Sequence, residues 1–206
     1  MATTQEELDL ALQEVANQMK IDRANSGGGG TVYYNSDYEP DDHNMLGWTI
    51  RPVLVSSQVA ITAGTAQMTR IKIVKTGTVN NVYFGVTNIA AGMTSCRIQI
   101  YSMAGVLLAT TADISTVVTS TGEKVVPLSV PLAVTAGQEL MVVVHALGTT
   151  GPTIRATVVL PGINYGLTTG SPLRTGRKTG LSAAPTAVVK TEYAAFANQI
   201  PLFMLG

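Results

Sequence analysis

Alternation of apolar and polar residues is the sequence feature that most restricts the fold of this chain. From about residue 31 onward the apolar residues recur at every second position rather than at helical spacing. Successive side chains of a strand point to opposite faces, so a period of two marks strands with one buried face. The clearest runs place Ile71 and Ile73, then Val82, Phe84 and Val86, and then Cys96, Ile98 and Ile100 on such a face. Arg97 and Gln99 are expected on the opposite, outward face.

Turn-rich segments separate these runs at short intervals. Further strand-like runs are "VLLATT", "EKVVPLSV", "ELMVVVHAL" and "TIRATVVL", and the segments between runs include "STGE", "TAGQ" and "GTTGP". Many short strands with almost no helical pattern are typical of antiparallel sandwiches and jelly rolls. The sequence therefore predicts a mainly β chain with an antiparallel, jelly-roll-like β-sandwich. Pro127 and Pro131 interrupt one run, which predicts an edge strand or a bulged strand there.

Residues 1–25 are the exception, because they predict one α-helix before the sandwich. Thr4 followed three residues later by Glu7 fits a capping box at the start of a helix. The apolar residues that then follow a 4-3-4 spacing are Leu8, Leu12, Val15 and Met19. That spacing predicts a short oligomerisation or docking seam over about two heptads. The alternative is a single amphipathic helix packed on its own domain.

The sequence divides into three parts. After the helix, residues 26–50 form a connector that begins with "SGGGG", a flexible tether, and continues with acidic and aromatic residues. Residues 51–206 are expected to form the β-sandwich, with a loop-rich C-terminal arm at about 161–190 that could lie on another subunit. The closing segment "FANQIPLFMLG" is apolar enough that we expect it to be buried in the domain or in a partner.

Charge is scarce and unevenly placed. Only 13% of the residues are charged, against about 25% in ordinary soluble domains, and this favours a protein that works inside an assembly. Residues 1–42 hold nine acids and two bases, whereas residues 43–206 hold four acids and eleven bases. This asymmetry suits contact between the two parts, within one chain or between copies, or contact of the sandwich with an anionic surface. The net charge of zero does not favour nucleic-acid binding.

Residues that carry catalytic chemistry are few. His43 and His145 are the two histidines, and His145 lies in an alternating run where a structural role is favoured over a catalytic one. No nucleophile elbow, zinc-binding motif or paired-cysteine motif occurs. Cys96 is the single cysteine and is expected to be a buried thiol. We therefore expect a protein that is not an enzyme, with no cofactor and no metal. The N-terminus does not resemble a signal peptide, and the longest apolar run, "LMVVVHAL", is too short to insert into a membrane.

The decapeptide "NSDYEPDDHN" gathers four carboxylates, and three interpretations of it stay open. The carboxylates belong to Asp37, Glu39, Asp41 and Asp42. The favoured interpretation is a solvated loop between the tether and the first core strand. The second is an ion-pair strip, within or between subunits, whose basic partners would be drawn from Arg70, Lys72, Arg174, Arg177 and Lys178. The third is a cation site, against which the absent sixth-position glycine and final glutamate of a calcium-binding loop argue.

Aromatic and basic residues supply candidate recognition surfaces. The aromatic residues around the acidic segment are Tyr33, Tyr34, Tyr38 and Trp48. Aromatic faces flanked by carboxylates can hold sugars, and the same residues can anchor a protein interface or close one end of the sandwich. The basic run "RTGRKTG", with Arg174, Arg177 and Lys178, resembles a loop that contacts phosphate or glycan.

The order of segments resembles small virion proteins of tailed bacteriophages, of the minor tail protein and head-fibre type. The resemblance rests on "TTQEELDLALQEVANQ" with "SGGGG", and on "KTGTVNNVYFGV", "YSMAGVLLATT" and "VPLAVTAGQEL" in the domain. It implies a homo-oligomer, with a trimer favoured, that contacts other virion proteins through the N-terminal helix. The sandwich would face a neighbouring subunit or a host cell-surface glycan.

Three classes of function follow. The leading expectation is a structural and attachment protein of the virion, made in the host cytoplasm, with the tail favoured over the capsid. An alternative within this class is a capsid decoration or head-fibre protein. The second class is a stand-alone carbohydrate-binding or adhesion module. A polysaccharide hydrolase is the third and is disfavoured, because a carboxylate pair in a cleft is required and only Asp113, Glu123, Glu139 and Glu192 lie beyond the N-terminal region.

Overall fold

A computed structural model describes residues 40–157, 174–195 and 199–206. These residues all belong to one compact unit, Asp37–Gly206. The predicted helix at 1–25, its seam residues and the glycine tether lie outside the described residues, as do Tyr33, Tyr34 and Tyr38. The described part of the chain is mainly β, and its helical elements are the short 3-10 turns η2 (Pro40–His43), η3 (Pro52–Leu54), η4 (Val117–Thr119) and η5 (Lys190–Glu192).

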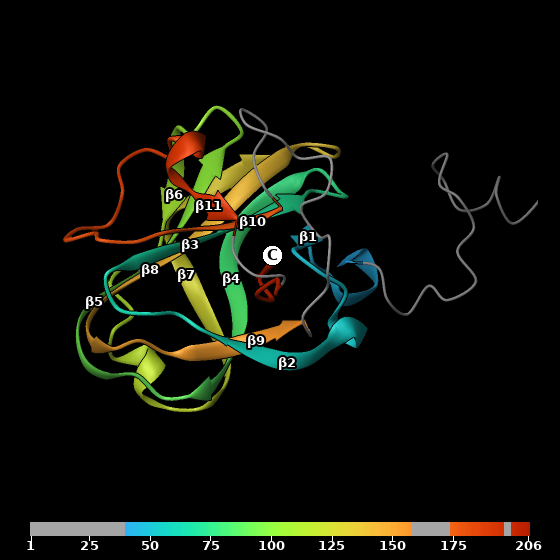
Figure 1. Ribbon diagram of the computed structural model, residues 1–206. Coiled ribbons are helices and arrows are strands. Elements are labelled where there is room, and N and C mark those ends of the chain that lie inside the picture. Colours follow the sequence, from blue (N-terminus) through green and yellow to red (C-terminus); the bar gives the residue numbers. More distant parts are fainter. Residues whose placement is uncertain (1–39, 158–173, 196–198) are drawn as a thin grey trace, which may run out of the picture. The chain divides into compact units, whose positions relative to one another are not determined.

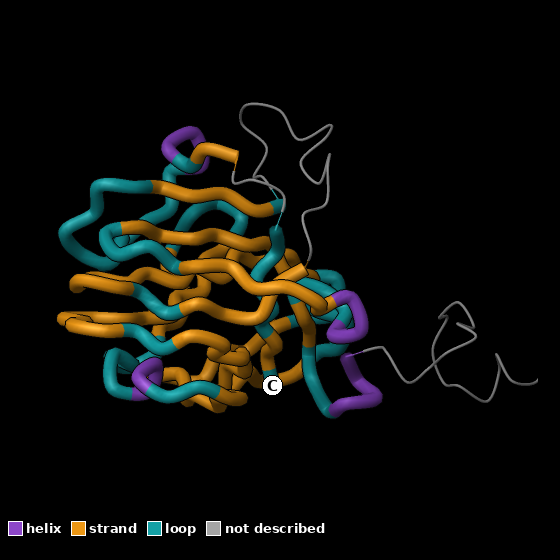
Figure 2. The backbone as a smooth tube through the Cα atoms, turned by 60° about the horizontal axis from the view of Figure 1, so that its bottom comes forward, coloured by secondary structure: helices purple, strands orange, loops and turns teal. Residues whose placement is uncertain are grey.

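The strands form two sheets in which every described pairing is antiparallel (Figure 1). Sheet A contains, in spatial order, β1 (Gly47–Trp48), β12 (Met204–Leu205), β4 (Gly77–Asn88), β9 (Thr153–Thr157) and β2 (Val55–Ala60), and β7 (Gly122–Val134) also pairs with β4. Sheet B contains β11 (Ala194–Ala195), β10 (Thr175–Lys178), β3 (Thr65–Lys72), β8 (Glu139–Thr150), β5 (Ala91–Ser102) and β6 (Leu107–Thr110). In Figure 2 the 3-10 turns, in purple, lie at the ends of the orange strands.

One hydrophobic core joins the two sheets, an arrangement consistent with a β-sandwich. Sheet A contributes Phe84 and Phe203, whose rings pack at a tilted angle with centroids 6.2 Å apart. Sheet B contributes Ile98 on β5 and its cross-strand partner Val144 on β8. The alternating pattern therefore predicted the buried face correctly on β3, β4 and β5: the residues from Ile71 to Ile100 that it assigned inward are all buried.

The two prolines of β7 coincide with an irregular edge strand, as predicted. β4 is the only strand with which β7 pairs among the described residues. The register of that pairing shifts between Pro127 and Leu132, opposite Val79 and Asn81, so the ladder is interrupted in the stretch that contains Pro131. Within this stretch Leu128 bridges instead to Thr111, which follows β6 of the other sheet. A residue without a backbone N–H is tolerated where the ladder is already broken.

The outer face of sheet B is covered by the segment from Leu181 to Tyr193, which we call the strap. The strap is anchored on both sides of β8: the N–H of Leu181 donates to Gly64, beside β3, and the side chains of Gln99 and Tyr101 on β5 donate to the carbonyl oxygen of Pro185. The prediction that Gln99 lies on the outward face of its strand is confirmed. Gln99 does point away from the core, but only 4% of it is exposed because the strap lies over it.

Gly105 allows the far end of the strap to approach. Its φ is +85°, and a Cβ at this position would lie 2.1 Å from the carbonyl oxygen of Val188. The N–H of Val188 donates to the carbonyl oxygen of Gly105 at 2.9 Å. Of the loop-rich arm expected at about 161–190, the described residues 174–190 thus lie against sheet B of the same chain, and Thr175–Lys178 is a strand of that sheet.

The C-terminal segment is buried within the domain, which was one of its two expected locations. Phe203 and Leu205 have no exposed surface, and β12 is inserted between β1 and β4. The preceding residues also pair with β9, because the N–H of Leu202 donates to Arg155 and the N–H of Thr157 donates to Ile200. The C-terminal segment therefore pairs with β1, the strand that ends at Trp48, and also contacts β9.

Candidate functional site

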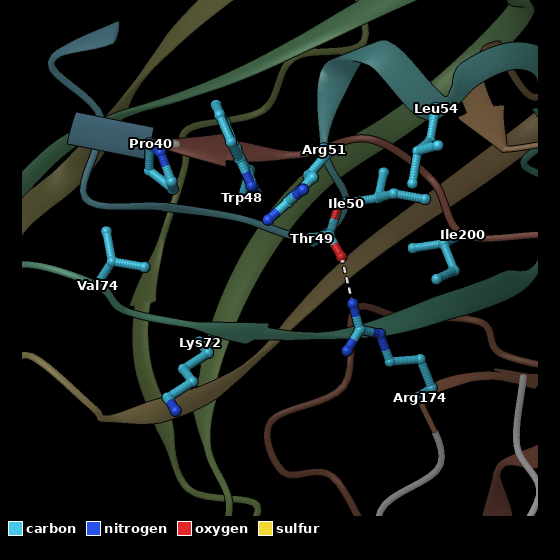
Figure 3. Close-up of a pocket in the computed structure, with 10 residues that line it drawn as sticks. All are labelled: Pro40, Trp48, Thr49, Ile50, Arg51, Leu54, Lys72, Val74, Arg174 and Ile200. Carbon is cyan, nitrogen blue, oxygen red and sulfur yellow. Dashed lines mark hydrogen bonds between the residues drawn. The ribbon is translucent and has the colours of Figure 1, made fainter. Parts of the chain in front are cut away.

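A cleft of about 500 Å³ lies beside β1 and the end of β3 (Figure 3). Its described lining residues come from four separated parts of the chain: Pro40, Trp48, Thr49, Ile50, Arg51, Leu54, Lys72, Val74, Arg174 and Ile200. We call it the Trp48 cleft. Its volume lies in the range of about 300–1,000 Å³ that is usual for small-molecule sites.

Close packing between β1 and the end of β3 forms one side of the cleft. The N–H of Val74 donates to the carbonyl oxygen of Leu46 at 2.9 Å. Gly47 permits this approach, because a Cβ there would lie 2.8 Å from the carbonyl oxygen of Lys72. Residues 46–48 and 72–74 are consequently held together, and Trp48 and Lys72 line the same cleft.

Thr49 fixes the floor of the cleft. It is fully buried, its hydroxyl donates to the carbonyl oxygen of Pro201 at 2.6 Å, and the N–H of Phe203 donates to the same hydroxyl at 2.9 Å. The carbonyl oxygen of Thr49 accepts a hydrogen bond at 2.9 Å from Nη2 of Arg174, the dashed line in Figure 3. Thr49 therefore links the C-terminal segment to Arg174, the cationic side chain at one wall of the cleft.

Arg174 is held in place by its backbone as well as by its side chain. Its carbonyl oxygen accepts a hydrogen bond from the N–H of Arg70 at 3.0 Å, directly before β10 begins. Partial burial, followed by the charge of Arg70, lowers the pKa of the Arg174 guanidinium, whereas Glu139 acts in the opposite direction. An arginine remains a cation at neutral pH even with such a shift, so this wall of the cleft carries a fixed positive charge.

The rest of the lining combines an aromatic ring with apolar and cationic side chains. Trp48 is half-buried, and its ring centroid lies 5.9 Å from that of His43, tilted by 53°. Leu54 and Val74 are 52% and 42% exposed, so the cleft opens to solvent. Arg51, Lys72 and Arg174 supply three positive charges from three segments, and no acidic residue is among the described residues that line the cleft.

The carboxylates that the structure describes have other roles. Glu139 pairs with Arg70 at 2.6 Å, Glu123 pairs with Arg155 at 2.8 Å, and Glu192 pairs with Lys178. Asp113 accepts hydrogen bonds from the N–H groups of Cys96 and Ser115. Within residues 40–157, 174–195 and 199–206 there is also no group of three or more side chains able to hold a metal ion. None of these four carboxylates is among the described residues that line the cleft.

Two of the residues singled out from the sequence meet in the cleft, and two others do not. Trp48 and Arg174, 126 residues apart, line it together. Arg177 points elsewhere: its Nε donates to Oε1 of Gln67 at 3.1 Å and its Nη2 to the carbonyl oxygen of Ala60 at 2.8 Å. Lys178 is paired with Glu192 of η5.

The acidic decapeptide is described only in part. Pro40–His43 form η2, and Pro40 lines the cleft. Asp37, Glu39 and the side chains of Asp41 and Asp42 lie outside what the structure describes, so its three interpretations stay open.

Sequence reasoning did not connect several residues to this site. Lys72 was considered only as a partner for the acidic segment, and Arg51, Leu54 and Ile200 were not considered at all. Trp48, Ile50 and Pro52 alternate in "WTIRP", a pattern that could have indicated an amphipathic extended segment beside Trp48. No local signal could have placed Ile200 here, because the contact depends on the course of the C-terminal segment.

His145 is a buried side chain away from the cleft. It has no exposed surface, and neither ring nitrogen has a hydrogen-bond partner among the residues that the structure describes. It faces the outer side of sheet B between its cross-strand neighbours Ala66 on β3 and Arg97 on β5. Burial lowers its pKa below the ordinary value of 6.5. This burial agrees with the structural role favoured from the sequence.

Comparison with known proteins adds no family to this description. No family model matches the sequence, and no curated protein matches it. Among the described residues no helix has the length and apolar character needed to cross a membrane.

Proposed function

We propose that this chain is a non-enzymatic structural and attachment protein of a bacteriophage particle, a minor tail protein or fibre. The observation that carries the proposal is the Trp48 cleft, a solvent-open site with one aromatic ring and three cations from separate segments. In this proposal residues 1–25 form a helix that trimerises or docks on other virion proteins, and the domain is a jelly-roll-like sandwich that presents the cleft to the host surface.

The sequence supports the structural part of this proposal. The segment order of helix, glycine tether and β-domain resembles virion proteins of tailed phages, and the low charged fraction suits a chain that works within an assembly. The described domain is also a compact unit that begins at Asp37. A separate domain behind a glycine tether suits a particle protein, because the attachment point and the outward domain can then obey different packing arrangements.

The chemistry of the cleft supports recognition over catalysis. General acid–base work needs a titratable pair within hydrogen-bond reach of a substrate, and the described lining residues contain no such pair. Cationic side chains and an indole ring, in contrast, are typical recognition groups at binding sites. A stand-alone carbohydrate-binding module is the second candidate function, and the same cleft favours it.

Native mass spectrometry tests the assembly part. We expect the full chain to have the mass of a trimer and a chain lacking residues 1–30 to have the mass of a monomer. If the full chain is monomeric and the truncation changes nothing, the oligomerisation helix is wrong and the stand-alone module is favoured.

Labelling of particles and cells tests the attachment part. Gold-labelled antibody against the chain should mark phage tails, whereas labelling of heads would favour a capsid decoration or head-fibre protein. The purified full chain should bind host cells, and Trp48→Ala should reduce that binding at least tenfold. Leu108→Ala is the matched control, since it truncates an exposed apolar side chain on β6 that does not line the cleft. Equal loss in both variants would contradict a role for the cleft.

A further inference from the structure

We propose that the strap opens in acid, when protonation of His145 lifts part of it from the outer face of sheet B. The part concerned is residues 181–185, which we call the crossing segment because it passes over β8. The inference is independent of the attachment function, because neither His145 nor the crossing segment is among the described residues that line the Trp48 cleft.

The crossing segment is held at its two ends, on opposite sides of β8. At one end the N–H of Leu181 donates to the carbonyl oxygen of Gly64, beside β3, at 2.9 Å. At the other end the carbonyl oxygen of Pro185 accepts a hydrogen bond at 3.1 Å from the side chain of Gln99 on β5. Four residue steps span at most about 14 Å, and the two strand spacings from β3 to β5 take about 10 Å. The segment therefore has to cross β8 directly.

His145 lies beneath this crossing. The N–H of Gly64 donates to the carbonyl oxygen of Ala146 at 2.8 Å, and Gln99 is the cross-strand partner of Val143, so the segment passes over β8 between these two positions. His145 shares the outer face with Val143, which packs in the cluster beneath the strap, because alternate residues of a strand face the same way. The imidazole has no exposed surface, and within the described part of the chain neither nitrogen has a hydrogen-bond partner.

The described groups that face His145 do not compensate a positive charge on it. Its cross-strand row on this face runs over β5, β8, β3 and β10 through Arg97, His145, Ala66 and Lys178. Two members of the row are cations, and Glu192 of the strap is paired with Lys178. The crossing segment, "LSAAP", has no ionisable side chain. A protonated imidazole under the strap is therefore disfavoured by burial and lies beside a cation.

Proton uptake consequently favours the open form. Burial lowers the pKa of His145 below its ordinary value of 6.5, and the pKa rises towards that value once the segment lifts and water reaches the ring. Below about pH 6.5 the open form takes up a proton that the closed form does not, whereas above this pH the two forms bind protons equally. Burial raises the pKa of the nearby phenols of Tyr101 and Tyr193, so neither is charged in acid.

The crossing segment is suited to local opening. Residues 182–183 are exposed, and Gly180 before them has a φ of +74° with no atom within 4 Å of where a Cβ would lie. Beyond the segment the strap is anchored again, because the N–H of Val188 donates to the carbonyl oxygen of Gly105 at 2.9 Å. Opening also brings water to the buried Oε1 of Gln99, which has no partner among the described residues. A segment with few buried apolar contacts opens at a lower free energy than the whole domain.

The surface beneath the segment is apolar. Val143 and Tyr101 have no exposed surface and belong to the cluster against which Leu181 of the strap packs. Acid would thus turn a covered part of sheet B into an exposed apolar strip, a kind of surface that commonly contacts other molecules.

Amide hydrogen exchange of the full chain, measured by NMR spectroscopy and corrected for the pH dependence of intrinsic exchange, tests the inference. Leu181 reports on the crossing segment, because its N–H is bonded across to Gly64. Val144 reports on the whole domain, because it lies on β8, which is paired on both sides. At pH 7.5 we expect Leu181 to be at least tenfold less protected than Val144. Between pH 6.5 and pH 5 the protection of Leu181 should fall at least fivefold, with a limit of about tenfold per pH unit.

Two histidine variants assign the pH dependence. His145→Leu should remove most of the fall in protection at Leu181, because leucine takes up no proton. His43→Gln is the matched control, since His43 is the other histidine of the chain and is an exposed residue of η2. This variant should keep the dependence of the wild type. The comparison of Leu181 with Val144 in the wild type does not depend on the folding of either variant.

Three results would overturn the inference. Equal protection of Leu181 and Val144 at every pH would mean that the strap opens only when the whole domain unfolds. Protection of Leu181 that stays constant from pH 7.5 to pH 5 would mean that opening does not expose His145. A fall in His145→Leu as large as that in the wild type would mean that another group takes up the proton.

Discussion

The hydroxyl of the buried Thr49 accepts a hydrogen bond from the backbone N–H of Phe203 at 2.9 Å, which joins the residue after β1 to the residue before β12. The same hydroxyl donates to the carbonyl oxygen of Pro201 at 2.6 Å. The residue that follows Trp48 is therefore held by the C-terminal segment, and the shape of the cleft depends on residues 152 and 154 positions away.

Thr49→Val tests this connection, because valine keeps the shape of threonine and removes its hydroxyl. Leaving buried partners unsatisfied costs about 1–3 kcal/mol, so we expect the free energy of unfolding in urea to fall by that amount. Thr49→Ser is the matched control, since serine keeps the hydroxyl and loses one methyl group. A valine variant as stable as the wild type would show that the two hydrogen bonds contribute nothing.

The anchoring of the strap gives a second prediction, and a second buried tyrosine packed nearby serves as its control. Tyr101 donates its hydroxyl hydrogen to the carbonyl oxygen of Pro185, whereas the buried hydroxyl of Tyr193 has no hydrogen-bond partner within the described part of the chain. Tyr101→Phe should lower stability by about 1 kcal/mol and speed amide hydrogen exchange in residues 181–193. Tyr193→Phe should leave stability unchanged or raise it. Equal effects of the two substitutions would contradict the assigned anchoring of the strap.

The inward side chains could be predicted from the sequence because local alternation carries that information. Phe84 and Ile98 lie inside because every second residue of a strand faces the same way, and this holds whatever the strand pairs with. The same reasoning placed Gln99 correctly on the outward face but did not show that it is buried there. Alternation shows that Gln99 points away from the core, but only the course of the strap, more than eighty residues later, decides that water does not reach it.

The cleft also shows what the local sequence pattern could not predict. Trp48 and Arg174 were singled out by residue type, yet nothing local showed that they meet, because their meeting depends on the hydrogen bond between Arg174 and the carbonyl oxygen of Thr49. Lys72 joins them through the close approach that Gly47 permits. Residue chemistry is visible in a sequence, whereas the convergence of four segments is a property of the tertiary fold.

His145 predicts an acid-dependent loss of stability. Burial lowers the pKa of this histidine below its ordinary value of 6.5, and its cross-strand neighbour Arg97 is also cationic. The unfolded chain therefore takes up a proton below about pH 6.5 that the folded chain does not, and stability is complete above this pH and declines below it.

Urea unfolding of the wild type and of His145→Leu between pH 7.5 and pH 5 measures this effect. The wild type should lose up to about 1.4 kcal/mol per pH unit from this group, and the variant should show a flatter dependence. Both proteins should share the same dependence between pH 7.5 and pH 9, which serves as the internal control. Parallel curves below pH 6.5 would rule out His145 as the source.

Cys96 gives the last prediction, because the single thiol reports on opening of the core. Its side chain has no exposed surface, and burial, with a smaller contribution from the charge of Asp113, raises its pKa to about 12. The thiolate is the reactive form, so the native chain should not react with Ellman's reagent at pH 8 within an hour. In denaturant one equivalent should react at once. Thr49→Val should react faster than Thr49→Ser under native conditions, because labelling then follows the population of opened molecules. Immediate reaction of one equivalent in the native wild type would contradict the buried position of Cys96 on β5.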